Sequence, residues 1–247
     1  MQNYLTIIMP NYNSYATLPS TIQSIQKQTF KNWKLVIVDD NSSEKTKKIL
    51  KGYKNNKKIK IYYLKKNRGA GYCRNFALKK TKSDYLAFID SDDIWKKNKL
   101  KEQLQFMIKN NYFFSYTYYN VINKNIKKKI YTPKIFNYNS FLKNTSIATS
   151  CMIVKNFKSK KIKFLETSSC DDFYFKCALL KKYKNAYCYP KFLTDYRIRS
   201  NSVQSNRYRN IFWVWKINKI YNKLNFIQNF LSIISISFNS LKKYGLR

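Results

Sequence analysis

The feature that most constrains the fold of this chain is the alternation of two kinds of segment between residues 5 and 90. Short apolar runs, with the length and β-branched content of buried strands, alternate with segments that carry apolar residues at helical spacing. The expected strands are Leu5–Met9, Lys34–Asp40, Ile59–Leu64 and Asp84–Asp90, and the expected helices are Leu18–Gln28, Asn41–Tyr53 and Gly69–Lys80. This order predicts an α/β fold with a Rossmann-like, mostly parallel sheet and flanking helices.

Polar residues follow each of the four expected strands. The clusters are PNYN from Pro10, DDNSS from Asp39, KKNRGAG from Lys65 and DSDD from Asp90. Carboxyl ends of parallel strands lie at one edge of a sheet, and ligands of such sheets bind there. We therefore expect the four clusters to form one ligand site.

The DSDD cluster places three carboxylates within four residues of a very basic chain. Asp90 and Asp92 form a D-x-D pair, and Mg²⁺ or Mn²⁺ typically uses one or two protein carboxylates together with substrate phosphates. An alternative for such acids is capping of the following helix, here expected from Ile94 onward. Asp90 and Asp92 are therefore candidate metal ligands, and Asp92 or Asp93 could instead cap that helix, with Asp93 as the expected cap. Asp39 and Asp40 have the same alternative, with Asn41 or Ser42 as competing caps.

Charge and composition narrow the class of protein. The 49 Lys and Arg against 12 Asp and Glu give a net charge of +37, which predicts an acidic partner such as nucleic acid, an anionic membrane or a phosphorylated substrate. An AT-rich coding sequence would also enrich Lys, so part of this charge needs no partner. Lys is spread along the chain rather than gathered with aromatics in a recognised module, which disfavours nucleic-acid binding. At 44% hydrophobic residues, the chain is too apolar for a disordered polycation.

Histidine is absent, and the five cysteines are scattered without a C-x-x-C pair. This excludes Ser-His and Cys-His nucleophile systems and disfavours a zinc site. Reduced thiols, together with an expected core strand that begins at Leu5 and leaves no room for a signal peptide, predict a cytoplasmic protein.

The second half is less regular and contains no Gly/Ser-rich linker. The expected elements are a helix over Lys96–Asn110, a hairpin of Tyr112–Ile122 with Lys128–Tyr131, a strand over Ser150–Val154 and a helix over Asp171–Lys182. We expect one catalytic domain over residues 1–205, followed by a basic amphipathic helical tail over residues 206–247.

The tail combines positive charge with apolar periodicity. From residue 196 to the end there are ten Arg and Lys and no Asp or Glu, and apolar residues recur every three or four positions. The uncharged run Asn225–Leu241 is too polar for a membrane span. A helix lying on an anionic membrane surface fits better, and the alternative is a helix that packs on the domain.

Seven segments of the chain carry a family resemblance. They are TIIMPNYN, QTFKNWKLVIVDDNSSEKT, KNRGAGYCRN, DYLAFIDSDDIW, TSCMIVK, CDDFYFKCALL and YRIRSNSVQSN. In this order and spacing they resemble the motifs of inverting family-2 glycosyltransferases with the GT-A fold, in the bacterial surface-polysaccharide branch. The resemblance implies a nucleotide-sugar-binding half over residues 1–95 and an acceptor half over residues 96–205.

The resemblance also implies an activity. Such an enzyme transfers a sugar, in a metal-dependent and inverting reaction, from a nucleotide sugar to a lipid-linked or surface-glycan acceptor. A UDP-sugar is the expected donor, and the pathway would be O-antigen, capsule or lipooligosaccharide biosynthesis at the inner face of the cytoplasmic membrane. A sugar-phosphate nucleotidyltransferase is the alternative enzyme, but the segment PNYN lacks the Gly-rich Arg-Lys signature of that class.

The resemblance also implies roles for individual residues. Those assigned to the donor nucleotide are Pro10, Tyr12, Asn13, Asp39, Asp40, Arg68, Arg74, Asp90 and Ser91; Asp90 and Asp92 are assigned to the metal (Mn²⁺ or Mg²⁺), and Arg197 and Arg199 to the neighbourhood of the phosphates. Asp172 corresponds to the catalytic base, with Asp171 beside it and Glu166 as a weaker candidate. The chain departs from the family in having Asp-Asp where Glu-Asp is usual, and Arg199 where many relatives have His.

Overall fold

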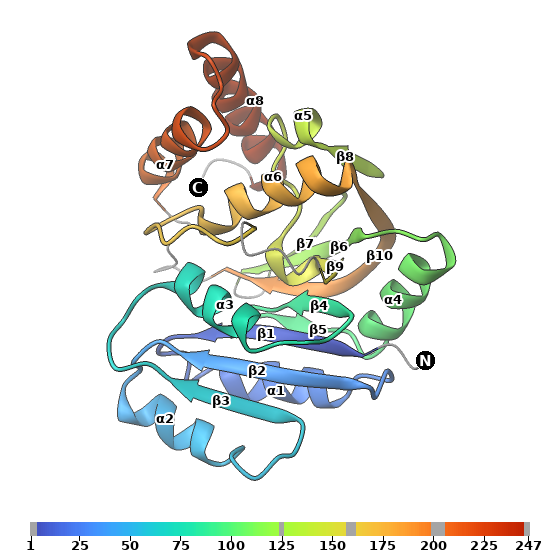
Figure 1. Ribbon diagram of the computed structural model, residues 1–247, viewed down its shortest axis with the longest axis vertical. Helices are drawn as coiled ribbons and strands as arrows, with labels where there is room; N and C mark the ends of the chain where they lie inside the picture. Colours follow the sequence, from blue (N-terminus) through green and yellow to red (C-terminus); the bar gives the residue numbers. More distant parts are fainter. Residues whose placement is uncertain (1–3, 124–125, 157–161, 199–205, 245–247) are drawn as a thin grey trace.

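The first four strands form the parallel half of the sheet. The computed structural model describes residues 4–123, 126–156, 162–198 and 206–244. Strands β1 (Leu5–Asn11), β2 (Trp33–Asp39), β3 (Ile59–Tyr63) and β4 (Tyr85–Phe88) pair in parallel in the order β3-β2-β1-β4. Helices α1 (Leu18–Gln26), α2 (Glu44–Lys51) and α3 (Ala70–Lys79) connect them (Figure 1). The α/β fold expected from the sequence is confirmed.

The sheet continues beyond β4 with strands of mixed direction. Its further members are β5 (Ile94–Trp95), β6 (Phe114–Asn123), β7 (Ile126–Ile130), β8 (Ile135–Asn137), β9 (Ile153–Lys155) and β10 (Asn185–Arg197). Strand β9 runs antiparallel to both β4 and β6, and β10 runs parallel to β6. The expected hairpin is present as β6 and β7. Within the described residues, ten strands therefore make one continuous sheet.

Two apolar layers cover the faces of this sheet. Successive residues of a strand point to opposite faces: in β1, Ile7 packs toward α1 and α4 (Lys99–Lys109), whereas Ile8 packs toward α3 and α6 (Asp171–Tyr183). β1 is buried along its whole length, as expected for a central strand between two helical layers.

Two expectations for the middle of the chain were wrong. No helix begins at Ile94, because Ile94 and Trp95 form β5 against β10, and α4 begins only at Lys99. The expected strand from Ser150 is shorter, because residues 149–151 form a 3₁₀ turn, η1 (Thr149–Cys151), before β9. Strand β10 was not predicted from the sequence, and its pairing with β6 is interrupted by register shifts between Tyr189 and Thr194.

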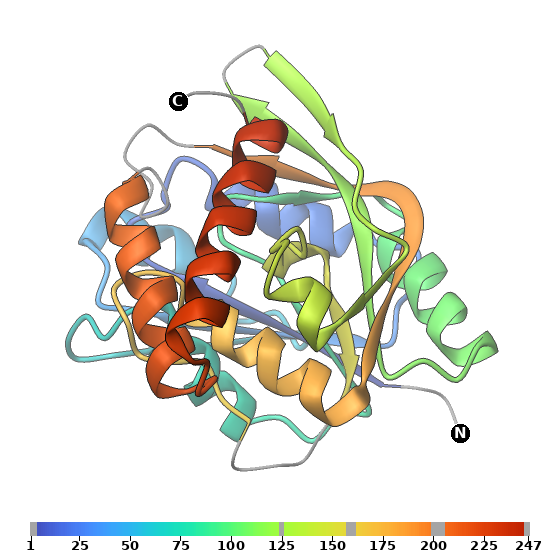
Figure 2. The same ribbon diagram turned by 90° about the horizontal axis from the view of Figure 1, so that it is seen from above.

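The C-terminal segment forms two helices rather than one. They are α7 (Arg207–Ile220) and α8 (Phe226–Tyr244), and both lie outside α6, at the end of the molecule away from β1–β3 (Figure 1 and Figure 2). Val214 and Ile217 of α7 belong to the same apolar core as α6. The tail thus packs on the domain, and among the described helices none is both long and apolar enough to cross a membrane.

Candidate active site

Hydrogen bonds join the polar clusters at the carboxyl edge of the parallel strands. The Asp40 carboxylate, after β2, accepts the backbone N–H groups of Arg68 and Gly69, each at 2.7 Å. The Asn11 amide of β1 donates to Asp39 at 2.6 Å. The structure therefore brings together residues of three of the four expected clusters.

Both carboxylates of the first acidic pair are buried and hydrogen-bonded. Asp39 also accepts hydrogen bonds from the backbone N–H and the hydroxyl of Ser42, and Asn13 accepts the N–H of Ser43 at 2.8 Å. Neither acid caps α2 directly, since Ser43 stands at its N-cap. Asp39, Asp40 and Asn13 hold the loops around the expected nucleotide pocket in place.

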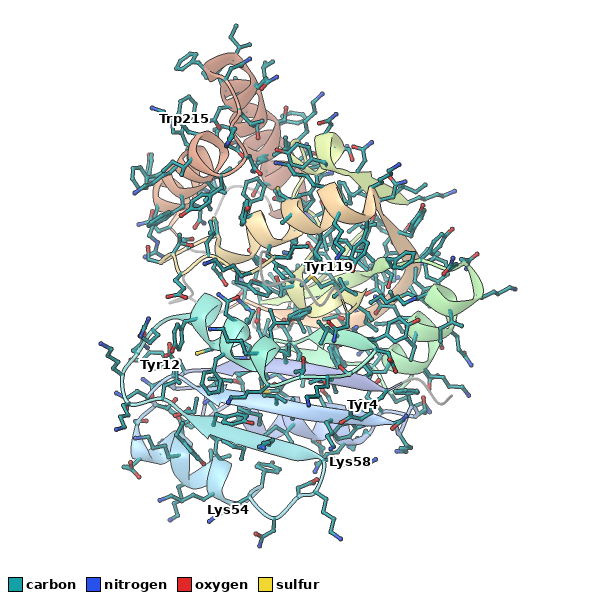
Figure 3. All side chains as sticks on the ribbon, viewed as in Figure 1. Tyr4, Tyr12, Lys54, Lys58, Tyr119 and Trp215 are labelled. Carbon is teal, nitrogen blue, oxygen red and sulfur yellow. The ribbon has the colours of Figure 1, made fainter. Side chains whose placement is uncertain are left out.

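Tyr12 stands apart from these buried groups. Its side chain is 51% exposed and lies at the edge of the molecule next to the loops of the nucleotide cluster (Figure 3). Pro10, by contrast, lies within β1, where its backbone pairs with β2. An exposed aromatic ring beside buried acids is a suitable stacking face for a nucleotide base.

The two glycines of the third cluster have different reasons to be glycine. Gly69 has φ of +85°, a backbone conformation that strains residues with a Cβ. Gly71 lies within α3, where a Cβ atom would approach the carbonyl oxygen of Leu165 to 2.0 Å. Gly71 thus permits the close approach of α3 to the segment that leads into Asp171.

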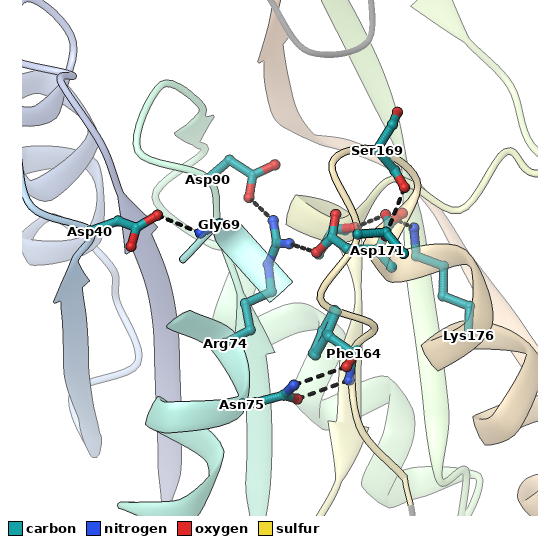
Figure 4. Close-up of polar contacts among 12 residues, drawn as sticks. Asp40, Gly69, Arg74, Asn75, Asp90, Phe164, Ser169, Asp171 and Lys176 are labelled. Atoms are coloured by element: carbon teal, nitrogen blue, oxygen red, sulfur yellow. Dashed lines mark hydrogen bonds and ion pairs between the residues drawn. The ribbon is translucent and has the colours of Figure 1, made fainter. Parts of the chain in front are cut away.

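Arg74 connects the DSDD turn with the acidic pair Asp171 and Asp172. Its guanidinium is almost fully buried and donates to Asp90 Oδ1 at 2.6 Å and to Asp171 Oδ2 at 2.5 Å (Figure 4). The neighbouring Asn75 amide exchanges two hydrogen bonds with the backbone of Phe164, each at 2.9 Å. The Arg-Asn pair of α3 therefore fixes the position of the D-x-D element relative to α6.

Asp171 and Asp172 open the first turn of α6, where the helix dipole favours negative charge. Neither is the cap, because Cys170 occupies the N-cap in a left-handed conformation. Burial raises the pKa of Asp171 to about 6, against the lowering effect of Arg74 and with a further increase from Asp172. The two acids of the pair thus have different environments.

Asp172 is held as an anion by two residues that the sequence analysis did not select. Burial would raise its pKa, but the Lys176 ammonium at 2.5 Å and the Thr149 hydroxyl bind the carboxylate and bring the pKa down to about 2. Lys176 is itself buried. Its i,i+4 spacing from Asp172 on an expected helix is a signal that could have identified it. Thr149 opens the motif TSCMIVK, but no spacing rule connects that motif with Asp172.

The DSDD turn separates its three acids. Asp93 is fully buried and accepts the backbone N–H of Arg197 at 3.0 Å, so its expected role as a helix cap was wrong. Burial, then Asp92 and Asp90, raise the pKa of Asp93. Asp90 and Asp92 are partly exposed, and the carbonyl of Ser91 between them accepts the hydroxyls of Thr17 and Thr21.

These carboxylates fit a hard divalent cation of the kind that also needs substrate oxygens. Across the described ranges no cluster of three or more Cys, Asp or Glu side chains could hold a metal ion by itself. The partly exposed carboxylates of Asp90 and Asp92, which repel the buried Asp93, provide negative charge and oxygen ligands. Mg²⁺ or Mn²⁺ typically completes its coordination shell with phosphate oxygens and water.

The remaining predicted residues have diverse partners. Arg68 lies 3.5 Å from Glu166 and over the ring of Tyr72, so the weaker base candidate is paired with a cation. Arg197 donates from its guanidinium to the Ser20 hydroxyl at 3.1 Å. Arg199 lies outside the described residues.

The sequence and the fold both match known proteins. The model of the family "Glycosyl transferase family 2" matches residues 6–186. The chain is 34% identical over 240 residues to the Escherichia coli UDP-Glc:alpha-D-GlcNAc-diphosphoundecaprenol beta-1,3-glucosyltransferase WfgD, covering 92% of this chain and 94% of that protein.

Solved structures of other proteins resemble the fold, among them the following two. Staphylococcus aureus TarS residues 1–349, in complex with UDP-GlcNAc, superposes with a TM-score of 0.77 at 20% identity, over 97% of this chain and 73% of that one. The Pyrobaculum calidifontis mannosyltransferase PcManGT, in complex with GDP-Man and Mn²⁺, gives a TM-score of 0.71 at 12% identity, over 99% of this chain and 71% of that one.

Proposed function

The chain belongs to glycosyl transferase family 2, and from this premise we propose that it transfers a hexose from a UDP-sugar to a saccharide carried on undecaprenyl diphosphate. The name of the E. coli relative supports both substrates, because that protein uses UDP-Glc and a GlcNAc-diphosphoundecaprenol acceptor. The reaction would be a step in the assembly of a bacterial surface polysaccharide on the cytoplasmic side of the membrane.

The observation that carries this proposal is the link made by Arg74. One buried guanidinium joins Asp90, at the donor edge of the sheet, to Asp171, in the acidic pair of α6. These acids come from the two halves of the chain. A glycosyl transfer needs donor and acceptor groups in one place, and this contact holds the two sets of acids together.

Asp90 and Asp92 would hold Mn²⁺ or Mg²⁺ between the protein and the donor diphosphate. When bound, the cation would stabilise the negative charge that develops on the departing nucleoside diphosphate. Tyr12, at the exposed edge of the nucleotide loops, would stack on the base. Arg68, Arg197 and Arg199 remain proposed neighbours of the phosphates.

Asp172 is proposed as the general base of an inverting transfer. Its carboxylate would take the proton of the acceptor hydroxyl while that oxygen bonds to the anomeric carbon and the bond to the diphosphate breaks. Asp171 would act as a positioning residue, because Arg74 occupies one of its oxygens. Thr149 and Lys176 orient Asp172 and keep it ionised.

The proposed function is tested by transfer to a defined acceptor. The purified protein, a short-chain lipid analogue of GlcNAc diphosphate and Mn²⁺ are incubated with UDP-glucose, UDP-galactose or UDP-N-acetylglucosamine. We expect a disaccharide product from one UDP-sugar, and NMR of this product should show that the anomeric configuration has been inverted. No product is expected after chelation of the metal.

GDP-mannose is the matched control donor in the same assay. Product from GDP-mannose alone would contradict the assignment of a uridine nucleotide. Retention of anomeric configuration would contradict the role of Asp172, because an inverting transfer uses a base opposite the leaving group.

Replacement of Lys176 by Met is expected to make transfer sensitive to acid. Without the ammonium, burial is opposed only by Thr149 and Arg74, so the pKa of Asp172 rises from about 2 and the carboxylate becomes protonated at a higher pH. The ratio of kcat/KM at pH 8 to that at pH 5 should exceed the wild-type ratio by about tenfold. The pH profile of kcat/KM measures it.

Lys181→Met is the control, because Lys181 lies on the same helix but is exposed and contacts the Tyr138 ring rather than Asp172. An unchanged profile in Lys176→Met would show that the ion pair does not set the protonation of the base.

A further inference from the structure

Helix α8 turns polar side chains toward the protein. Asn229 and Ser232 are 2% and 3% exposed, and both are hydrogen-bonded. The Ser232 hydroxyl donates to the Leu142 carbonyl at 2.6 Å, and the Asn229 amide donates to the Trp215 carbonyl at 3.0 Å. Asn218 of α7 donates to both side chains at 3.1 Å. Polar contacts, supplemented by Ile233 and Ile236, thus attach α8 to the domain.

The opposite side of α8 is an apolar stripe that faces outward. It consists of Ile227, Leu231, Ile234, Phe238 and Leu241, and we call it the α8 stripe. Its members recur at spacings of four and three residues, which places them on one face of the helix. Each is between 40% and 68% exposed. A contiguous apolar surface of this kind marks an interaction site rather than ordinary surface composition.

Aromatic rings extend this surface toward α7. The ring of Phe226 lies 5.5 Å from that of Trp215 and 6.4 Å from that of Phe230. Trp215 lies at the outer side of the two helices (Figure 3). Phe212 is exposed on the same helix as Trp215. The apolar surface is therefore shared by both C-terminal helices.

The charges of these helices identify the partner. The basic residues of the two helices are Arg207, Arg209, Lys216, Lys219, Lys242 and Lys243, and Lys223 lies in the turn between the helices. No acid occurs between residue 196 and the end of the chain. Apolar and aromatic side chains on a helix with basic neighbours are suited to the boundary between acyl chains and anionic headgroups. We infer that α7 and α8 bind the surface of an anionic lipid bilayer, with the α8 stripe inserted into it.

This surface is coupled to the candidate active site. Trp213 of α7 donates to the Ser168 hydroxyl at 2.9 Å, and Ser169 donates to Asn210. Both serines belong to the turn that precedes Asp171 and Asp172. A bilayer bound by α7 and α8 therefore contacts the helices that hold the turn before the acidic pair, which deepens the proposed use of a lipid-linked acceptor.

Vesicle sedimentation tests the inference without donor or acceptor. The full chain is mixed with vesicles of phosphatidylcholine containing about a quarter phosphatidylglycerol. The double variant Ile227→Gln/Leu231→Gln is expected to bind these vesicles at least tenfold more weakly than the wild type. The control Ile126→Gln/Ile135→Gln changes two equally exposed isoleucines of β7 and β8 and should bind like the wild type.

Three outcomes would overturn the inference. Equal binding of the Ile227→Gln/Leu231→Gln variant and the wild type would show that the stripe does not insert. Equal binding to pure phosphatidylcholine vesicles would show that anionic headgroups are not recognised. Absence of vesicle binding, with a dimer in sedimentation velocity that the variant loses, would show that a second copy covers the stripe.

Thermal unfolding of each variant serves as the control for an intact fold. Transfer to the short-chain acceptor analogue, measured without vesicles, should be unchanged in the Ile227→Gln/Leu231→Gln variant. Absence of that transfer in the wild type would refute the proposed function, whereas absence of vesicle binding by a wild type that still transfers would refute only the membrane inference.

Discussion

Replacement of Asp172 by Asn is expected to lower kcat for sugar transfer by about a thousandfold while UDP-sugar affinity stays within about twofold. The carboxamide has nearly the same shape but cannot take a proton from the acceptor hydroxyl. A carboxylate with a pKa of about 2 is ionised throughout the working pH range. Its weak basicity is sufficient, because the hydroxyl becomes strongly acidic as its oxygen bonds to the anomeric carbon. Saturating kinetics give kcat, and calorimetry gives donor affinity.

The neighbouring acid provides the comparison for this experiment. Asp171→Asn weakens the contact with Arg74 and should reduce donor affinity together with kcat, because Arg74 also holds Asp90. The pKa of Asp171, raised to about 6 by burial, makes it the stronger base of the two. If Asp172→Asn keeps near wild-type transfer and Asp171→Asn abolishes it without loss of donor binding, Asp171 is the base.

Replacement of Asp92 by Ala is expected to remove the metal dependence of UDP binding. In the wild type, Mn²⁺ should strengthen UDP binding by on the order of a hundredfold, because the cation offsets the repulsion between the diphosphate and the acids of the DSDD turn. Asp92→Ala removes one proposed ligand and should reduce this enhancement to within a few-fold of unity. Calorimetric titration of UDP with and without Mn²⁺ measures both values.

Asp84→Ala is the matched control for charge. Asp84 precedes β4, at the opposite end of the strand from the DSDD turn, and accepts the backbone N–H of Tyr4. This variant should retain the full metal effect. An Asp92→Ala protein with an undiminished metal effect would exclude Asp92 as a ligand and leave Asp90 and the donor itself as the source of coordination.

The first ninety residues could be predicted well because their signals are local. Apolar runs of strand length and helical spacing depend only on neighbours in the sequence, and they located β1 to β4 and α1 to α3 to within a few residues. The second half gave weaker signals. Strand β10 includes Pro190, Lys191 and a bulge, and β5 has only two residues, so neither shows the alternation of a half-buried strand.

In the candidate site, sequence motifs located the residues but not their partners. The acidic clusters and the Arg-Asn pair were found by their motifs, but the partners of Arg74 are 16 and 97 residues away in the chain. No spacing rule connects residues so distant. Asp93 was assigned to a helix cap because a helix was expected after it, and the assignment failed when β5 took that place.

The sequence by itself determined the order of strands and helices in the first ninety residues, and its motifs indicated the family and the acids proposed for the site. Only the tertiary structure decided which charges meet: Arg74 with Asp90 and Asp171, and Lys176 with Asp172. It also decided that the α8 stripe faces outward, whereas the periodicity of the sequence could show only that a stripe exists. Periodicity arises from bonded neighbours, but burial and ion pairing depend on contacts between distant parts of the chain, and these contacts set the pKa values and surfaces on which the proposed function depends.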